Sequence, residues 1–491
     1  MQRMSAADVV PYWMAPIIPN DQFVVYVFAD DRPGDAGELA AWIATRAAGV
    51  ADLRLRVLDI PFTLDRPYWV HADILPSQFV VDDAERTWED CLAVLADRMS
   101  EQLDPTEMAW RVHLFAHVSG VPGTELSGVE VSDASAGPSG NVRAGVVVAL
   151  QVSHALGDGR RTAAITRELF GPAAPIPANR AYPARALPDS TLRVAGAVIG
   201  AARLPAQFAW MIARGFVAWQ RYRAAPPQQA AGVPLSRLNR APGTDRTLRT
   251  LTVERDALRI GDRGVTVGAL VAISLALPTF LGDPDGRLVV ELTVARTSKR
   301  PSRNNFRRKS SRRNNFRNVG VDLHVDEPDL AQRARLIAGE IDAARRADED
   351  PARVASRAAT AATPAALTRW GIGHFDPTAV PERITGVTVV SSVNRGAGDL
   401  MLDGRPVLAT TGFPALSPVQ GLTHGVHGIA DQVTISVTTS PEIAPDVDDY
   451  LTLLSEAIDQ LEAFRTSGVR AGRAAPAMDR GRSEGNSASH V

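Results

Sequence analysis

A continuous β-branched run in the first half of the chain constrains its fold more than any other feature. Residues 144–152 read AGVVVALQV, a pattern typical of a strand that is covered on both faces, because a strand with one wet face alternates apolar and polar residues. The polar, glycine-rich segment before it predicts a loop, and RRTAAITRELF behind it predicts a helix. A buried strand followed by a turn and a helix indicates a layered α/β fold.

The length of the chain predicts more than one domain. Its 491 residues exceed the roughly 250–300 over which a single hydrophobic core grows. Strand and helix patterns mix in both halves, so we expect two similar α/β layers with a site where they meet. We predict an N-terminal domain over 1–185, a helical connector and linker over 186–243 and a C-terminal domain over 244–465. The tail over 466–491 is small, polar and charged, which predicts disorder.

Composition narrows the class of protein. Apolar residues make up 45% of the chain and charged residues 22%, as in soluble globular proteins. We find no signal-peptide pattern and no uncharged apolar stretch of about 18 residues, so a cytoplasmic protein is expected, with peripheral contact at the inner membrane face left open. The single cysteine, Cys91, excludes an intramolecular disulfide and a Cys-based zinc cluster. His113 and His117 lie in a strand pattern without a glutamate partner, so we predict no metal site.

The segment QVSHALGDGRR (151–161) carries the candidate chemistry. His154 lies just past the buried strand, and an imidazole there can take a proton from an alcohol that attacks an acyl carbonyl. Asp158 is suited to fixing the turn, either by capping backbone N–H groups or by pairing with an arginine. Gly159 permits a positive φ or a close backbone approach. The alternative is a plain turn whose histidine and aspartate cap one another.

Several segments occur together with this motif in a fixed order. They are MSAADVVPYWMA, LDPTEMAWRVHLF, TVGALVAISLALPTFL, NNFRNVGVDLHVDEPDL and VVSSVNRGAGDLMLDGRPV followed by ALSPVQGLTHGVHGIADQVTISV. In this order they resemble the bacterial wax ester synthase/diacylglycerol acyltransferase family, within the coenzyme A-dependent acyltransferase superfamily that has the HxxxDG motif. The resemblance implies two chloramphenicol acetyltransferase-like mixed-sheet α/β domains, joined by a crossover, with an active-site tunnel at their interface. It also implies His154 as general base, Asp158 as a mainly structural residue, acyl-CoA as co-substrate and no cofactor.

The chain departs from the family pattern at several positions, and we treat four of them as substrate-binding candidates. Ser153 stands where the family has the first of two histidines, and Gly268 stands where it has the asparagine of an Asn-Asp pair. The family's Ser-Asn-Val-Pro-Gly-Pro reads Ser-Ser-Val-Asn-Arg-Gly here, which makes Ser392 and Asn394 the other two candidates.

Two basic segments indicate contacts with anions or membranes. The stretch 296–317 is strongly basic and contains no acid. In it we expect Arg307, Arg308, Arg312 and Arg313 to contact the CoA phosphates or anionic lipid, with a plain solvated loop as the alternative and no nucleic acid as partner. Residues 191–223 predict a helix with a stripe of arginines, broken or kinked at Pro205, that either lies on a membrane or lipid droplet or packs on the protein body.

Together these features predict an acyl-CoA-dependent O-acyltransferase that forms triacylglycerol or wax-type esters from a hydrophobic alcohol or diacylglycerol. Two alternatives stay open. One is a diverged homologue that acylates another lipid or a polyketide alcohol, and the other is a catalytically impaired protein that binds lipid or acyl-CoA.

Overall fold

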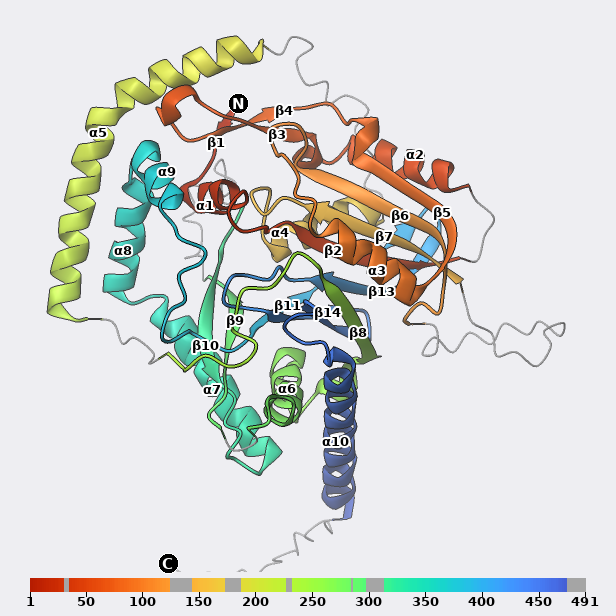
Figure 1. Ribbon diagram of the computed structural model, residues 1–491. Coiled ribbons are helices and arrows are strands. Elements are labelled where there is room, and N and C mark those ends of the chain that lie inside the picture. Colours follow the sequence, from red (N-terminus) through yellow and green to blue (C-terminus); the bar gives the residue numbers. More distant parts are fainter. Residues whose placement is uncertain are drawn as a thin grey trace, which may run out of the picture.

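Two six-stranded mixed sheets organise the molecule (Figure 1). The computed structural model describes residues 1–30, 35–123, 144–172, 187–226, 232–283, 286–296 and 313–474. The predicted fold class, a mixed α/β protein with two sheet-based layers, is confirmed.

The first sheet has the order β12-β13-β2-β7-β6-β5. Strand β7 lies between β2 and β6 and is buried along its length after its first residue, as its sequence predicts. The strands are β2 (Gln22–Ala29), β5 (Phe79–Thr87), β6 (Trp110–Ser119), β7 (Ala144–Val152), β12 (Met401–Leu402) and β13 (Arg405–Phe413). A small sheet of β1 (Gln2–Arg3), β4 (Tyr68–His71) and β3 (Leu55–Leu58) lies beside it.

The second sheet has the order β10-β9-β11-β14-β15-β8, with β11 parallel to both of its neighbours. Its strands are β8 (Thr247–Glu254), β9 (Val289–Ala295), β10 (Phe316–Asp322), β11 (Val389–Asn394), β14 (Leu422–Ile429) and β15 (Gln432–Thr439). Strands β12 and β13 lie in the C-terminal half of the chain, which also supplies the second sheet, yet β13 pairs antiparallel with β2 of the first sheet. This crossover joins the two layers.

Helices cover the sheets on their outer faces (Figure 1). Buried residues of α6, α7 and α10 form one hydrophobic core with the second sheet. The first sheet has a core on each face: α2 and α4 contribute to one, and α3, which carries the buried Cys91, contributes to the other. The helices are α1 (Ala6–Met14), α2 (Ala36–Ala47), α3 (Trp88–Arg98), α4 (Gly159–Phe170), α5 (Asp189–Ala224), α6 (Val265–Leu281), α7 (Leu330–Ala347), α8 (Pro351–Ala362), α9 (Ala365–Gly373) and α10 (Val447–Ala474). Short 3-10 turns are η1 (Ala51–Arg54), η2 (Pro61–Thr63), η3 (Pro76–Gln78) and η4 (Arg255–Leu258).

Two helices differ from the sequence prediction. Helix α5 continues through Pro205 and curves around the outside of the molecule (Figure 1). Proline removes one backbone hydrogen bond, but the carbonyl that loses its partner, that of Ala201, belongs to an exposed residue that water can reach. Helix α10 extends past the predicted domain end at 465 and reaches Ala474. Residues 475–491 lie outside the described part.

A buried carboxylate connects the start of the chain to its second half. Asp8 of α1 is fully buried, and its Oδ1 accepts hydrogen bonds from the backbone N–H of Arg313 (3.0 Å), the backbone N–H of Asn314 (2.8 Å) and the Asn314 side-chain amide (3.2 Å). Burial raises the pKa of Asp8, and these hydrogen bonds oppose that rise. One side chain therefore holds residues that are about 300 positions away in sequence.

We predict that Asp8→Ala lowers stability by about 2–4 kcal/mol, because it leaves three buried donors without an acceptor. The midpoint of thermal unfolding checks this prediction. Glu456→Ala, which removes an exposed carboxylate on α10, is the matched control and should change the midpoint little. Equal midpoints for the two variants would contradict the assigned role of Asp8.

Candidate active site

The turn between β7 and α4 holds the candidate base. Asp158 is the N-cap of α4: its Oδ1 accepts from the Arg161 N–H at 3.0 Å and its Oδ2 from the Asn315 N–H at 2.9 Å. Of the two roles expected for this aspartate, the structure shows backbone capping. Gly159 allows a close approach, because a Cβ there would lie 3.0 Å from Cγ2 of Val393 in the second sheet.

His154 lies where the two sheets face each other. Its carbonyl oxygen accepts a hydrogen bond from the Asn314 side-chain amide at 2.9 Å, and its ring packs at 5.3 Å, centroid to centroid, against Phe316. Its Nδ1 is buried and has no hydrogen-bond partner among the described residues. Burial lowers the pKa of the imidazole below 6.5, although its own carbonyl, Asp158 and Asn314 oppose the shift. The ring is therefore neutral at pH 7.

A cavity of about 400 Å³ opens in front of this ring. Both sheets contribute to its wall: β2, the β7–α4 turn and the end of β13 on one side, and β9, β10, β11 and β14 on the other. Much of the wall is apolar. The apolar side chains include Phe23, Val24, Phe316, Val393, Phe413 and Leu416.

Polar side chains on the second sheet face the same cavity. Glu291 is half-buried and hydrogen-bonded by the Asn318 amide, and burial raises the pKa of its carboxyl group. Arg395 and His427 also line the cavity and are nearly inaccessible to solvent. Sequence reasoning missed all three as site residues. The signal for Arg395 was its replacement of glycine in the family motif, whereas the other two face the cavity only because of strand register.

Two of the four predicted substrate-binding residues lie at cavities. Ser392 lines the central cavity, and its hydroxyl bonds that of Thr266 at 2.8 Å. Ser392 and Asn394 also line a neighbouring cavity of about 640 Å³. Ser153 is buried, with its hydroxyl directed to the Ala155 N–H, and it does not line the central cavity.

Gly268 also lies away from the cavity, contrary to the substrate-binding role expected for it. It is buried in α6 against η4, where a Cβ would lie 1.7 Å from the backbone carbonyl oxygen of Leu258. No side chain fits at this distance. Glycine here allows α6 to pack directly on a backbone segment, and an asparagine would force the two apart.

Arg313 has a different environment from the exposed phosphate contact that the basic stretch suggested. Its guanidinium is 6% exposed, binds Asp52 at 3.0 Å and the Leu156 carbonyl at 3.3 Å, and packs over the Trp69 ring. The Arg313 side chain therefore stabilises the turn between β7 and α4 by bonding the Leu156 carbonyl. Arg307, Arg308 and Arg312 lie outside the described residues, and their contact with CoA or lipid stays a prediction.

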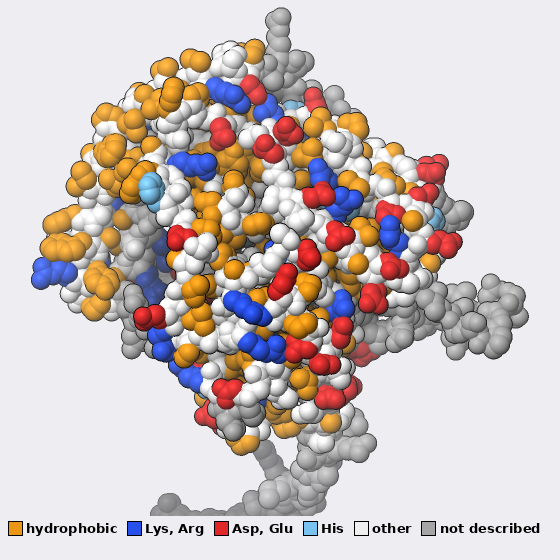
Figure 2. All heavy atoms as spheres, viewed as in Figure 1, with side chains coloured by type: hydrophobic (Ala, Val, Ile, Leu, Met, Phe, Trp, Pro, Cys, Tyr) orange, Lys and Arg blue, Asp and Glu red, His pale blue; other side chains and the backbone are white. Residues whose placement is uncertain are grey.

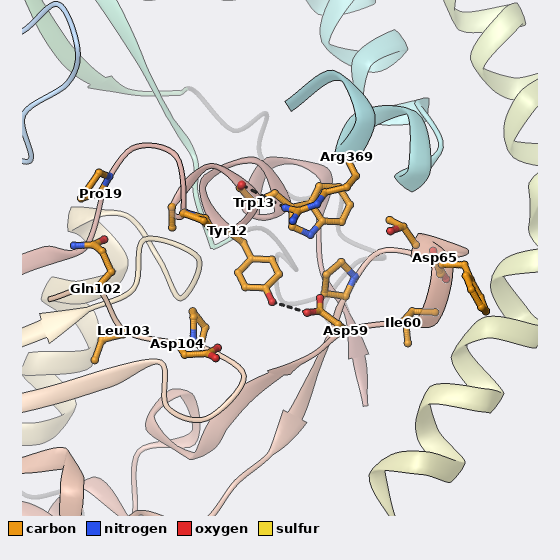
Figure 3. Close-up of a pocket in the computed structure, with 16 residues that line it drawn as sticks. Tyr12, Trp13, Pro19, Asp59, Ile60, Asp65, Gln102, Leu103, Asp104 and Arg369 are labelled. Atoms are coloured by element: carbon orange, nitrogen blue, oxygen red, sulfur yellow. Dashed lines mark hydrogen bonds between the residues drawn. The ribbon is translucent and has the colours of Figure 1, made fainter. Parts of the chain in front are cut away.

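A second cavity, of about 670 Å³, adjoins the first, since Pro19 lines both. Figure 3 shows the Tyr12 ring directed to Asp59, whose Oδ2 accepts the tyrosine hydroxyl at 2.9 Å, and Arg369 beside Trp13. The exposed η2 turn with Phe62 forms part of its rim. Within the described part of the chain, no three His, Cys, Asp or Glu side chains are grouped as metal ligands.

Similarity to known proteins covers part of the chain by family model and most of it by structure. Residues 313–462 match the family model of the WS/DGAT C-terminal domain. A wax ester synthase/diacylglycerol acyltransferase from Marinobacter aquaeolei VT8 is similar in structure, with a TM-score of 0.58, 16% identity and coverage of 94% of this chain and 99% of that one. A search of curated proteins by sequence found no match.

A second solved structure has the same fold. It is a mutant starter condensation domain of rhizomide synthetase RzmA in complex with C8-CoA and Leu-SNAC, with a TM-score of 0.52, 13% identity and coverage of 94% of each chain. At these identities the structural likeness shows the fold alone. Residues 313–462 thus carry a WS/DGAT C-terminal domain, which confirms the family resemblance seen in the motifs, and the chain as a whole has the fold of both solved structures.

Proposed function

We propose that the protein is an acyl-CoA-dependent O-acyltransferase that uses His154 as general base. The observation that carries this proposal is a neutral imidazole that faces a largely apolar cavity between two sheets. The Asn314 amide fixes the backbone of this histidine by bonding its carbonyl oxygen. The WS/DGAT C-terminal domain and the names of both relatives, a wax ester synthase and a domain bound to C8-CoA, support acyl-CoA as donor.

The proposed reaction needs one base and no covalent acyl-enzyme. Since Nδ1 of His154 is enclosed, Nε2 accepts the proton of the acceptor hydroxyl. The oxygen attacks the thioester carbonyl carbon, the C–S bond breaks, and the imidazolium returns the proton to the CoA thiolate. The products are an ester and CoA. Asp158 and Asn314 position the ring by fixing the backbone on both sides of it.

The acceptor in this proposal is a hydrophobic alcohol or diacylglycerol, giving wax-type esters or triacylglycerol. The apolar wall that includes Phe23, Phe413 and Leu416 supports an apolar chain beside the reacting hydroxyl.

We expect His154→Ala to lower the rate of CoA release from palmitoyl-CoA, with a long-chain alcohol or diacylglycerol as acceptor, by about 10²–10⁴-fold. The variant should keep the wild-type melting temperature, because the ring faces a cavity. His117→Ala, which removes a half-exposed histidine on β6, should have the wild-type rate. A His154→Ala rate above about a tenth of wild type would exclude the base role.

The pH dependence follows from the direction of the His154 shift. Because burial lowers its pKa, the imidazole stays unprotonated to a lower pH than a free imidazole does. We therefore expect kcat/KM to be constant near neutrality and to fall on the acid side with a midpoint below 6.5. A midpoint above that value would mean that another group controls the reaction.

We also propose that α5 seats the protein on an anionic membrane surface. No helix in the described part of the chain is long and apolar enough to cross a membrane. Six apolar side chains of α5 nevertheless form a stripe that is 42–66% exposed and lies within about 80° of arc. They are Val194, Val198, Phe208, Ile212, Phe216 and Trp219.

The placement and charge of α5 support this contact. Helix α5 runs along the outside of the molecule (Figure 1). Its buried side is marked by Gly196 and Gly200, which face Ile60 and Leu64, so the stripe on the opposite side points away from the body. Hydrophobic side chains gather at the same edge in Figure 2. Five arginines and a single aspartate make the helix basic, which favours an anionic lipid surface.

We predict that replacing Ile212 and Phe216 by glutamine lowers co-sedimentation with phosphatidylcholine vesicles containing phosphatidylglycerol by about tenfold. Val81 and Met401, exposed apolar residues elsewhere, give the matched double-glutamine control, which should bind like wild type. Unchanged binding of the α5 variant would refute the docking face. Loss of a dimer in that variant, without vesicle binding by wild type, would instead assign the face to a second copy of the chain.

A further inference from the structure

Arg395 is a buried cation that the proposed reaction does not use. It directly follows β11, is 4% exposed and lines the central cavity. One of its side-chain N–H groups donates to the Gly159 carbonyl at 3.1 Å, while its Nε is buried without a hydrogen-bond partner. No aspartate or glutamate among the described residues forms a salt bridge with it, and burial lowers the pKa of its guanidinium.

His427 adds a second unpaired nitrogen at this end of the cavity. His427 pairs with Val393 of β11, and the backbone N–H of Arg395 donates to the carbonyl of Gly428. This pairing brings the side chains of His427 and Arg395 close together. Two glycines make room for the imidazole: a Cβ on Gly412 or Gly425 would lie 3.0 or 2.6 Å from its Cε1. Its Nδ1 is buried without a partner, and burial together with Arg395 holds its pKa well below the usual value, so the ring is neutral.

The acidic side chains of the cavity do not balance this charge. Both oxygens of Asp158 are occupied by backbone N–H groups. Glu291 is bonded to Asn318, and burial favours its neutral form. A buried guanidinium with one neutral acceptor is costly, and a ligand that supplies an anion removes that cost. Arg395 also stands where the family motif has glycine, so the charge is a property of this chain and not of the fold.

We propose that Arg395, with His427 beside it, binds a carboxylate or phosphate on an amphipathic ligand whose apolar part lies along the Phe23 and Phe413 wall. The planar guanidinium offers paired N–H groups that match two oxygens of such a head group. In the proposed function this ligand is the acceptor, which narrows the hydrophobic alcohol to one that also carries an acidic head group. That last identification rests on the acyltransferase proposal, whereas the anion site does not.

The test compares three ligands that share one alkyl chain and differ in head group: palmitate, hexadecyl phosphate and hexadecanol. Calorimetric titration of wild-type protein should show at least one anionic ligand binding about tenfold or more tightly than the alcohol. Arg395→Met should reduce that preference to within about twofold, and Arg395→Lys should keep part of it. Arg98→Met, which changes a half-exposed arginine on α3, should bind all three as wild type does. The preference between palmitate and the phosphate identifies the head group.

Several outcomes would overturn the proposal. One is a wild-type protein that binds all three ligands equally, a result that stands even if neither Arg395 variant folds. Another is an Arg395→Met variant that folds and keeps the full preference for anions. A third comes from kinetics: if Arg395→Met lowers kcat equally for a fatty alcohol and an ω-hydroxy fatty acid, the arginine stabilises the reacting oxyanion and not a substrate head group. Because titration needs no turnover, failure of the acyltransferase proposal would leave the binding result intact and recognisable.

Discussion

The hydrogen bonds around residues 313–316 are the constraint on which the site depends. Asn314 bonds Asp8 at the start of the chain and the carbonyl of His154, while the Asn315 N–H bonds Asp158 and the Phe316 ring covers the imidazole. Three parts of the chain that are far apart in sequence meet here. The short segment thus fixes the backbone on both sides of the candidate base, and it also leads directly into β10 of the second sheet. Contact between the two layers and the geometry of the site therefore depend on the same hydrogen bonds.

Local patterns in the sequence predicted the elements that hold the base. The unbroken apolar run of β7 and the change to helical spacing after Gly159 place His154 at a strand end, and Asp158 caps the following helix as an aspartate in that position should. These features depend on neighbouring residues alone. The family resemblance implied a crossover between the domains. Strand order and the exchange of β13 into the first sheet could not be predicted from periodicity, because they depend on pairing between distant segments.

The predictions that differ from the structure involve contacts that sequence does not display. Gly268 looked like a lost polar residue, but its role is set by the Leu258 carbonyl that approaches the helix from another segment. Arg313 looked like part of a solvated basic loop, but Asp52 and Trp69 enclose its side chain. In both cases the contacting residue comes from another segment, which the sequence pattern does not identify. Arg395 shows the converse: a surface-type residue in the sequence becomes a buried charge because the strand before it ends between the sheets.

The central claim is that Nε2 of His154 accepts the hydroxyl proton inside a cavity that the 313–316 segment keeps in place. Chemical rescue tests this claim most directly. Free imidazole and its substituted derivatives are added to the His154→Ala variant, and CoA release from palmitoyl-CoA is followed with a fixed acceptor. We predict a saturable rescue whose rate rises with the basicity of the added imidazole, since the space left by the ring adjoins the cavity. Restored activity that is independent of basicity, or no rescue in a variant that folds and binds acyl-CoA, would contradict it.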